Sequence, residues 1–241
     1  MADDPALLAS AQELRYRVFV EELGASGPMV DHDRQLERDR FDEICDHMLL
    51  IDDAVDQVAG VYRLIRPEHA AAAGRYYSED EFDVSALKSS GRRLLELGRS
   101  CLHQDYRGGA AMFHLWNGLA AYVEAHEIDV LFGVASFPGT DVAALAEPLS
   151  VLHHSFLAPP ELRPKAHSAH GVPMDMLPAA SVDRRKAMMR VPALIKGYLR
   201  LGGLVGQGAW IDHDFNTADV CLVLDTAQMN ARRRSIYANP Q

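Results

Sequence analysis

The sequence predicts an α/β fold with a mixed sheet, and three stretches support this prediction. Residues 47–52 and 57–65 are two apolar runs around a polar turn, which is typical of a β-hairpin. Residues 93–102, 109–126 and 129–137 follow as strand, helix and strand, which indicates a parallel βαβ unit. The last of these runs is apolar throughout, as expected for a strand buried on both faces.

Further elements are expected on either side of this centre. Apolar residues recur at three- and four-residue steps over 5–23, which favours an N-terminal helix. Residues 141–154 predict a helix with an acidic first turn, and 192–203 predict one that starts with proline and ends on glycine. Two closing strands are expected at 208–212 and 219–225.

The length and composition are those of a globular protein. The chain has 241 residues, of which 48% are hydrophobic and 24% charged, so it can bury a full core. We expect one domain over residues 1–241. A proline-rich excursion with little regular structure is expected at about 157–190, before the closing helix and strands.

Charge and cysteine content exclude several classes of protein. A net charge of -10 argues against nucleic-acid binding, which relies on neutralising phosphates. The three cysteines lie far apart, so we expect reduced residues and neither a disulfide framework nor a zinc site (Cys45, Cys101 and Cys221). The acidic stretch 31–46 lacks the spacing of a calcium loop, so no metal is expected.

The termini and hydropathy predict a cytoplasmic protein. The first residues lack the basic start and apolar core of a signal peptide, and no apolar run approaches the roughly 18–20 residues that span a bilayer. The basic tail 231–234 has two interpretations: a disordered charged tail, or a weak contact with a membrane or a carrier protein. Peripheral contact with the inner membrane therefore stays an alternative.

The clearest chemical feature is the stretch 94–112. An apolar run that contains Glu96 ends in the turn 106–110, which holds Arg107 and a glycine pair, and a helix follows at once. Glycines allow the backbone to approach a phosphate, and the helix N-terminus adds positive potential. The alternative is a tight turn without a ligand. Neither a Walker loop nor a dinucleotide fingerprint is present.

Glu96 is the candidate general base. A carboxylate within an apolar strand must be partnered or solvated, and partial burial would raise its pKa toward neutrality. A structural ion pair with Arg99 is an equally good interpretation. The acidic loop 28–46 is either solvated or offers carboxylates to a cationic substrate. Cys101 and the pair His153–His154 lack the surroundings of a thiol or serine nucleophile.

Six segments in one order resemble the GNAT-fold N-acyltransferases, and within them the ornithine N-alpha-acyltransferases that make lyso-ornithine lipid. A related pattern occurs in the N-acylhomoserine lactone synthases. The matching segments are 14–19, 39–47, 62–64, 96–100, 132–137 and 194–202. The resemblance runs from about residue 13 to 225. It implies a GNAT-like, three-layer α/β/α fold with a mixed, splayed central sheet.

The resemblance also implies a two-substrate site. Its catalytic residues would be Glu96 as base, a backbone N–H near Gly98 as oxyanion donor, and Arg99. Its acceptor residues would be Arg15, Phe19, Asp39, Asp42 and Arg63. The aspartates would bind the cationic groups of ornithine, and Arg15 or Arg63 its carboxylate. The acyl donor's phosphopantetheine would lie on Arg107, Gly108, Gly109 and Ala110.

Two departures from the related patterns refine the expected donor and product. The later glycine steps of the general GNAT loop hold Ala110 and Met112 here, which favours a thioester on acyl carrier protein over acyl-CoA. Residues 23–25 read Leu-Gly-Ala where the lactone synthases carry a tryptophan, which argues against a lactone product. The expected partners are acyl carrier protein and a small amino acid, with no permanently bound cofactor.

We therefore expect an N-acyltransferase that moves a 3-hydroxyacyl group to the α-amine of ornithine. The alternatives are a lactone synthase, an acyltransferase for another amino acid, and a degenerate GNAT module that only binds acyl carrier protein or lipid. A long acyl chain needs an apolar channel, although for each candidate lining residue singly ordinary core packing is the better interpretation (Leu115, Trp116, Leu131 and Phe137).

Overall fold

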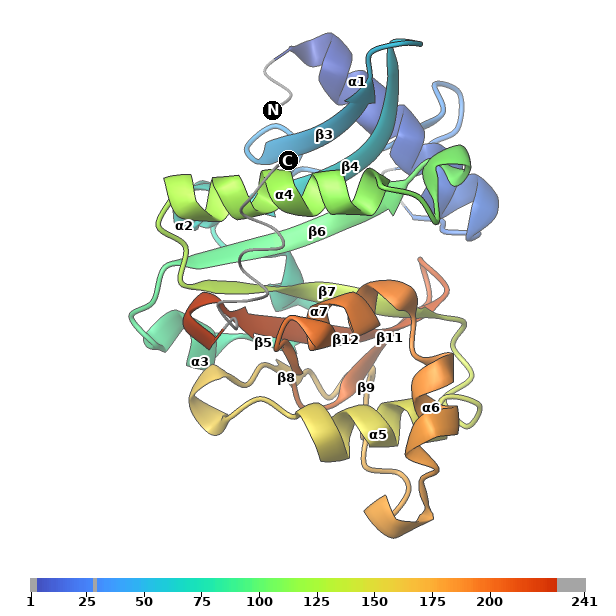
Figure 1. The fold of residues 1–241 in the computed structure, drawn as a ribbon, viewed down its shortest axis with the longest axis vertical. Coiled ribbons are helices and arrows are strands. Elements are labelled where there is room, and N and C mark those ends of the chain that lie inside the picture. The colour runs from blue at the N-terminus through green and yellow to red at the C-terminus, as the bar shows by residue number, and fades with distance from the viewer. Residues whose placement is uncertain (1–3, 28–29, 229–241) are drawn as a thin grey trace. The chain divides into compact units, whose positions relative to one another are not determined.

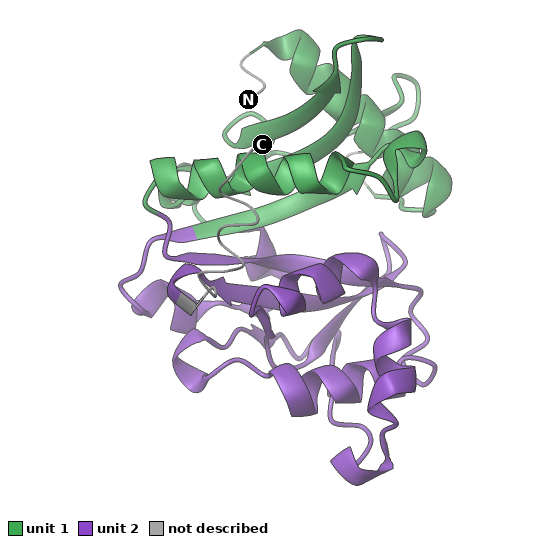
Figure 2. Cartoon of the chain, in the orientation of Figure 1, with its two compact units in different colours: residues 1–76, 95–127, 231–241 green, residues 77–94, 128–230 purple. Residues whose placement is uncertain are grey.

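The computed structural model describes residues 4–27 and 30–228, and the chain forms two compact units (Figures 1 and 2). Of the described residues, unit 1 takes those up to 76 and 95–127, and unit 2 takes the remainder. The basic tail 231–234 lies outside the described residues. Assignment of the whole chain to one domain stays a prediction.

The strands of unit 1 form where the apolar runs predict them. β3 (Asp46–Asp52) and β4 (Gln57–Ile65) make the expected hairpin, and β6 (Leu94–Leu102) pairs antiparallel with β4 (Figure 1). The register places His47 opposite Arg63 on one side of β4 and Gly98 opposite Arg63 on the other. Arg63 of β4 therefore lies between residues of the two neighbouring strands, β3 and β6.

Helices cover both faces of these strands. α1 (Pro5–Arg15) packs through Ala11 and Leu14 against Val61 of β4. From α4 (Ala111–Ala125), Trp116 Nε1 donates to the Tyr62 hydroxyl at 3.4 Å. Successive residues of a strand point to opposite faces, so α1 and α4 lie on opposite sides of β4. The face covered by α1 carries the polar residues described below.

The predicted helix over 5–23 changes its type midway. After α1 ends at Arg15, Tyr16–Glu22 continues as a π-helix. Nothing in the sequence predicted this change, because π-helical segments are rare. The remaining short elements of unit 1 are β1 (Val30–Asp31), β2 (Leu36–Glu37), α2 (Pro67–Ala73) and the 3₁₀ turn Gln104–Tyr106.

Unit 2 is built on β7 (Val130–Pro138) and β12 (Thr217–Asp225), which pair antiparallel along their whole lengths. β12 is buried from Thr217 to Leu224. Around this pair, β10 and β11 are neighbours of β12, β9 pairs with β11, and β5 pairs with β8. Their bounds are β5 (Phe82–Asp83), β8 (Lys165–Ala166), β9 (Gly171–Val172), β10 (Leu204–Val205) and β11 (Ala209–Asp212).

The helices of unit 2 differ from expectation at two places. α5 (Ala146–Phe156) begins five residues after Asp141, because that carboxylate accepts from the Ala144 N–H and closes a turn. Residues 157–190 hold more regular structure than expected, including β8, β9 and α6 (Arg184–Arg190). α6 forms because it follows the last proline of the excursion, Pro178, and is capped by the Asp183 side chain.

The other helical segments of unit 2 are short apart from α7 (Ala193–Arg200), which packs on β12 at its predicted place. The short segments are α3 (Ser85–Ser89) and the 3₁₀ turns Tyr77–Asp80, Pro160–Leu162, Ala179–Ser181 and Thr226–Gln228. None of the helices described in either unit is long and apolar enough to cross a membrane.

Candidate functional site

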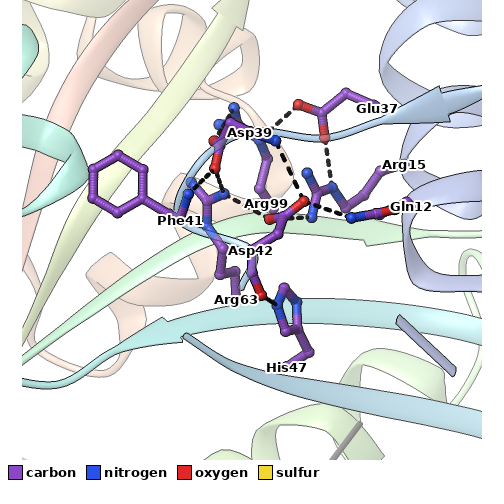
Figure 3. Close-up of polar contacts among 9 residues, drawn as sticks. All are labelled: Gln12, Arg15, Glu37, Asp39, Phe41, Asp42, His47, Arg63 and Arg99. Carbon is purple, nitrogen blue, oxygen red and sulfur yellow. Dashed lines mark hydrogen bonds and ion pairs between the residues drawn. The ribbon is translucent and has the colours of Figure 1, made fainter. Parts of the chain in front are cut away.

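Three arginines and three carboxylates of unit 1 form a buried ion-pair network (Figure 3). Arg15 comes from the end of α1, Arg63 from β4 and Arg99 from β6, so three separate elements converge. The carboxylates come from β2 and the loop that follows it. We call this set the arginine–carboxylate network: Arg15, Glu37, Asp39, Asp42, Arg63 and Arg99.

Asp42 lies at the centre of the network. Its Oδ1 accepts from Arg15 Nη1 at 2.8 Å and from Arg63 Nη1 at 2.9 Å. Its Oδ2 accepts from Gln12 Nε2 at 3.0 Å, and its backbone oxygen lies 2.9 Å from His47 Nε2. A carboxylate with this many partners is fixed in one orientation.

Asp39 and Glu37 link the remaining arginine to this centre. Asp39 Oδ1 accepts from Arg63 Nη1 at 2.6 Å, and its Oδ2 accepts from Arg99 Nη2 at 3.0 Å. Glu37 accepts from Arg15 Nε at 2.5 Å and from Arg99 Nε at 3.1 Å. The three positive and three negative charges are therefore balanced and each carboxylate contacts two arginines.

Burial and charge together set the ionisation of these groups. Burial alone would raise the pKa of Asp42, but the Arg15 and Arg63 guanidiniums outweigh it and hold that pKa well below its ordinary value. The pKa values of Glu37 and Asp39 are lowered in the same way, against the effect of burial, by Arg99 and by Arg15 or Arg63. All three acids are thus ionised near neutral pH.

Exposure separates the edge of the network from its interior. The Arg15 and Arg63 side chains are 0% exposed, whereas those of Arg99 and Asp39 are 10% and 12% exposed. The predicted acceptor residues are thus brought together, but Arg15, Arg63 and Asp42 are engaged with one another. Arg99 and Asp39 have the most exposed side chains of the network.

A bulge in β6 places Arg99 at this edge. β4 pairs Arg63 with Gly98 and Val61 with Cys101, so Arg99 and Ser100 share one partner position. The φ of Arg99 is +50°, a left-handed conformation that is uncommon for a residue with a side chain. A bulge leaves backbone groups out of the ladder, here next to Gly98, where an oxyanion donor was predicted.

Glu96 lies on the same face of β6 as Gly98, because the two residues are two positions apart before the bulge. Glu96 is 1% exposed. Burial raises the pKa of the Cys45 thiol to about 12, and the negative charges of Asp39, Asp42 and Glu96 add to the shift while Arg63 opposes it. The Glu96 carboxylate is therefore close enough to share an electrostatic environment with the network.

The predicted donor turn follows β6. Arg107 donates to the Leu102 carbonyl from Nε at 3.0 Å and from Nη2 at 2.9 Å, and its Nη1 lies 2.7 Å from Glu22. Gly108 has φ +78°, which explains a glycine at this position. Ala110 caps α4 without a side-chain hydrogen bond, which leaves the first N–H groups of α4 for another acceptor.

The other predicted residues lie in the hydrophobic cores. Phe19 packs against a hydrophobic cluster that joins α1 to the strands and includes Leu14 and Val61. Burial raises the pKa of the Cys101 thiol to about 12, so Cys101 is no thiolate nucleophile. The four candidate channel residues are buried or half-buried: Leu115, Trp116, Leu131 and Phe137.

Sequence reasoning missed two members of the site, Glu37 and Gln12. Glu37 stood among many acids of the loop 28–46, and nothing in its spacing marked it. The sequence pattern also did not indicate a group of three carboxylates in unit 2, where oxygens of Glu81, Asp212 and Asp219 lie within 4.8 Å of one another. A carboxylate cluster alone does not identify an ion site, so we assign it no ion.

Comparison with known proteins gives two kinds of match. Residues 14–117 match the model of the acetyltransferase (GNAT) domain. A solved CoA-dependent acyl-homoserine lactone synthase superposes with a TM-score of 0.55 at 13% identity, over 97% of this chain and 81% of that chain. An N-acyl amino acid synthase from uncultured soil microbes superposes with a TM-score of 0.54 at 12% identity, over 96% and 93%. These matches confirm the GNAT-like fold class.

Curated relatives match over nearly the full chain. The L-ornithine N(alpha)-acyltransferase of Rhodobacter capsulatus is 54% identical, over 98% of this chain and 93% of its own length. The protein of the same name from Brucella abortus is 43% identical, over 98% and 87%. That from Agrobacterium fabrum is 43% identical, over 95% and 80%. The chain therefore belongs to the L-ornithine N(alpha)-acyltransferase family.

Proposed function

We propose that this chain transfers a (3-hydroxy)fatty acyl group from acyl carrier protein to the α-amine of L-ornithine, giving lyso-ornithine lipid. The observation that carries the proposal is the match to named L-ornithine N(alpha)-acyltransferases over nearly the whole chain, at up to 54% identity. The arginine–carboxylate network is consistent with this function, because its more exposed edge carries one positive and one negative side chain, which suits a zwitterionic amino acid.

The acceptor binds at the exposed edge of the network. Arg99 provides a guanidinium for the amino-acid carboxylate, because it is the network arginine with exposed surface. Asp39 provides the carboxylate for a cationic group of ornithine. Arg99 and Asp39 are held in place by the buried members of the network behind them, which include Arg15, Arg63 and Asp42. This assignment moves carboxylate recognition from Arg15 or Arg63 to Arg99.

The chemical step uses groups of β6. Glu96, directly or through water, removes a proton from the α-ammonium, and the freed amine attacks the thioester carbonyl carbon. A backbone N–H near Gly98 stabilises the oxyanion that forms. The nitrogen of the tetrahedral intermediate loses a second proton as the C–S bond breaks, and the expelled pantetheine thiolate takes up that proton and leaves as a free thiol. The amide product remains.

The donor binds through the turn 107–110 and the start of α4. The α4 N–H groups donate to the phosphate of the pantetheine arm, while Arg107 holds the turn against the end of β6. Acyl-CoA carries the same pantetheine thioester and is the alternative donor. Ala110 and Met112, in place of glycines, favour the carrier protein.

A basic surface in unit 2 supports a macromolecular donor. Residues 184–200 contain six cations and no acidic residue, although the chain as a whole carries a net charge of -10. We call this the α6–α7 basic surface: Arg184, Arg185, Lys186, Arg190, Lys196 and Arg200. Among the described residues, Arg185, Lys196 and Arg200 have no carboxylate within 4.0 Å. Met189, which is 66% exposed, adds an apolar contact. Such a surface suits an acidic partner.

Thiol release tests the reaction directly. The purified chain is mixed with a 3-hydroxyacyl thioester, on either acyl carrier protein or CoA, and with one amino acid of a panel: ornithine, lysine, glutamine or glycine. We expect ornithine with the carrier protein to give the highest kcat/KM. A preference for another acceptor, or thiol release that needs S-adenosylmethionine instead, would contradict the proposal.

A further inference from the structure

We infer that Glu37 is a positioning residue for acceptor recognition: it fixes the Arg99 guanidinium so that the amino-acid carboxylate can bind it. The inference rests on the proposed function, because it assigns Arg99 to the acceptor. Glu37 itself is 2% exposed and lies behind the edge of the network, so it does not touch the substrate.

The position of Glu37 explains how it can hold two arginines. β2 is only two residues long, and both Leu36 and Glu37 are buried. β2 pairs with β1 through Asp31 opposite Leu36 and Val30 opposite Glu37. The backbone of Glu37 is therefore held by the strand pair, and its carboxylate projects into the network (Figure 3).

The two oxygens of Glu37 serve different partners. Oε2 accepts from Arg15 Nε at 2.5 Å, and Oε1 accepts from Arg99 Nε at 3.1 Å. Arg15 is immobilised on its other side by Asp42. Glu37 thus connects the exposed Arg99 to the fully buried part of the network, which gives Arg99 a rigid support.

Two contacts fix the plane of the Arg99 guanidinium. Glu37 holds Nε, and Asp39 holds Nη2 at 3.0 Å. A planar fork held at two of its nitrogens presents its other donors in a set direction, which a carboxylate can meet with two hydrogen bonds. Without the Glu37 carboxylate, the guanidinium loses the contact that holds Nε.

Glu37 also balances charge. Without its carboxylate, the three arginines of the network would face two carboxylates, and both Arg15 and Arg99 would lose an ion-pair partner. Glu37→Gln keeps the size and one acceptor oxygen but removes the charge. It therefore loosens Arg99 with little change in packing.

Acceptor kinetics test this role. For Glu37→Gln we expect the KM for ornithine to rise at least tenfold, while the KM for the acyl donor stays within twofold of wild type. Glu79→Gln is the matched control, because it removes a Glu carboxylate paired with a partly exposed Lys88 in unit 2. The control should leave both KM values unchanged.

A double variant separates positioning from a general loss of structure. If Glu37 acts through Arg99, Glu37→Gln adds less than twofold to the ornithine KM when Arg99 is already alanine. The inference would be overturned if Glu37→Gln raised the ornithine KM by the same factor in the wild type and in Arg99→Ala, or if the donor KM rose in parallel.

Glu37→Asp is the second variant, used if Glu37→Gln does not fold. Its shorter carboxylate cannot span both arginines, so an unchanged ornithine KM would also overturn the inference. Absence of wild-type turnover with every amino acid would instead refute the proposed function.

Discussion

Arg15 and Arg63 illustrate how burial limits what a charged residue can do. Both match motif positions at which a substrate-binding arginine is expected, yet both are fully buried and paired within the chain. Removing one partner of a buried pair destabilises a protein by about 3–5 kcal/mol, so a loss of activity at these positions would arise through the structure. The resemblance read from the sequence predicted one site for Arg15, Asp39, Asp42, Arg63 and Arg99, and the structure brings these residues into one ion-pair network. The sequence could not assign pairs, because pairing depends on register and loop geometry.

Glu96 gives the sharpest prediction at the residue scale. Glu96→Gln keeps the shape of the side chain but cannot accept the ammonium proton, so kcat should fall about 10²- to 10⁴-fold. Steady-state thiol release measures the change, and thermal unfolding checks the fold. Glu13→Gln, an exposed acid on α1, is the control and should keep wild-type rates. Near-normal turnover of Glu96→Gln would exclude Glu96 as the base.

At the scale of elements, the sequence predicted most helices and strands but not their irregularities. The apolar runs located β3, β4, β6, β7, α4 and α7 to within a few residues. The bulge at Arg99 escaped prediction because no glycine marks its positive φ. The π-helical continuation of α1 escaped prediction because π-helical segments are rare and no residue type marks them in the sequence.

The end of α7 shows where a glycine is required. A Cβ at Gly203 would lie 2.7 Å from the Tyr198 carbonyl oxygen, a backbone atom that cannot move aside. Gly203→Ala should therefore lower the free energy of unfolding by about 1–3 kcal/mol. Urea denaturation measures the change. Gly109→Ala is the stability control, because its Cβ would meet nothing closer than 3.9 Å, and an equal loss in both variants would contradict this explanation.

The α6–α7 basic surface makes a prediction about the donor. Arg185→Glu combined with Lys196→Glu reverses charge on this surface and should reduce kcat/KM with acyl carrier protein about tenfold, by weakening electrostatic association. The KM for ornithine should not change. Lys165→Glu, an exposed charge reversal on β8, is the control. An equal loss with a small pantetheine thioester would show that the surface does not serve the carrier protein.

At the scale of the whole molecule, the fold class and family were accessible from the sequence, because ordered motifs cover most of the chain. The GNAT-domain match and the full-length relatives confirm both predictions. The division into two compact units was not accessible. It depends on contacts between distant segments: residues 77–94 join unit 2, although unit 1 segments flank them on both sides.

The network also predicts how stability changes with pH. The folded pKa values of Glu37, Asp39 and Asp42 lie below their ordinary values of 4.5 and 3.8, so the unfolded chain binds more protons than the folded one. Their stabilisation is complete above the ordinary values and is lost as the pH falls below them. Burial lowers the pKa of His47 from 6.5, which adds a loss that begins near that pH.

Urea midpoints at several pH values measure this dependence. We expect the midpoint to fall slightly from pH 7 to 5 and steeply below about pH 4.5. Glu37→Gln should show a shallower acid limb, because one shifted carboxyl is gone. A midpoint that stays constant down to pH 3.5 would contradict the ionisation assigned to the network.

The position of the new amide shows which amine of ornithine the chain acylates. The chain is incubated with 3-hydroxyacyl carrier protein and ornithine labelled with ¹⁵N at the α-nitrogen only, and tandem mass spectrometry locates the label in the product. We expect the amide nitrogen to carry ¹⁵N and the δ-amine to stay free. An unlabelled amide nitrogen, or no amide product, would contradict this expectation.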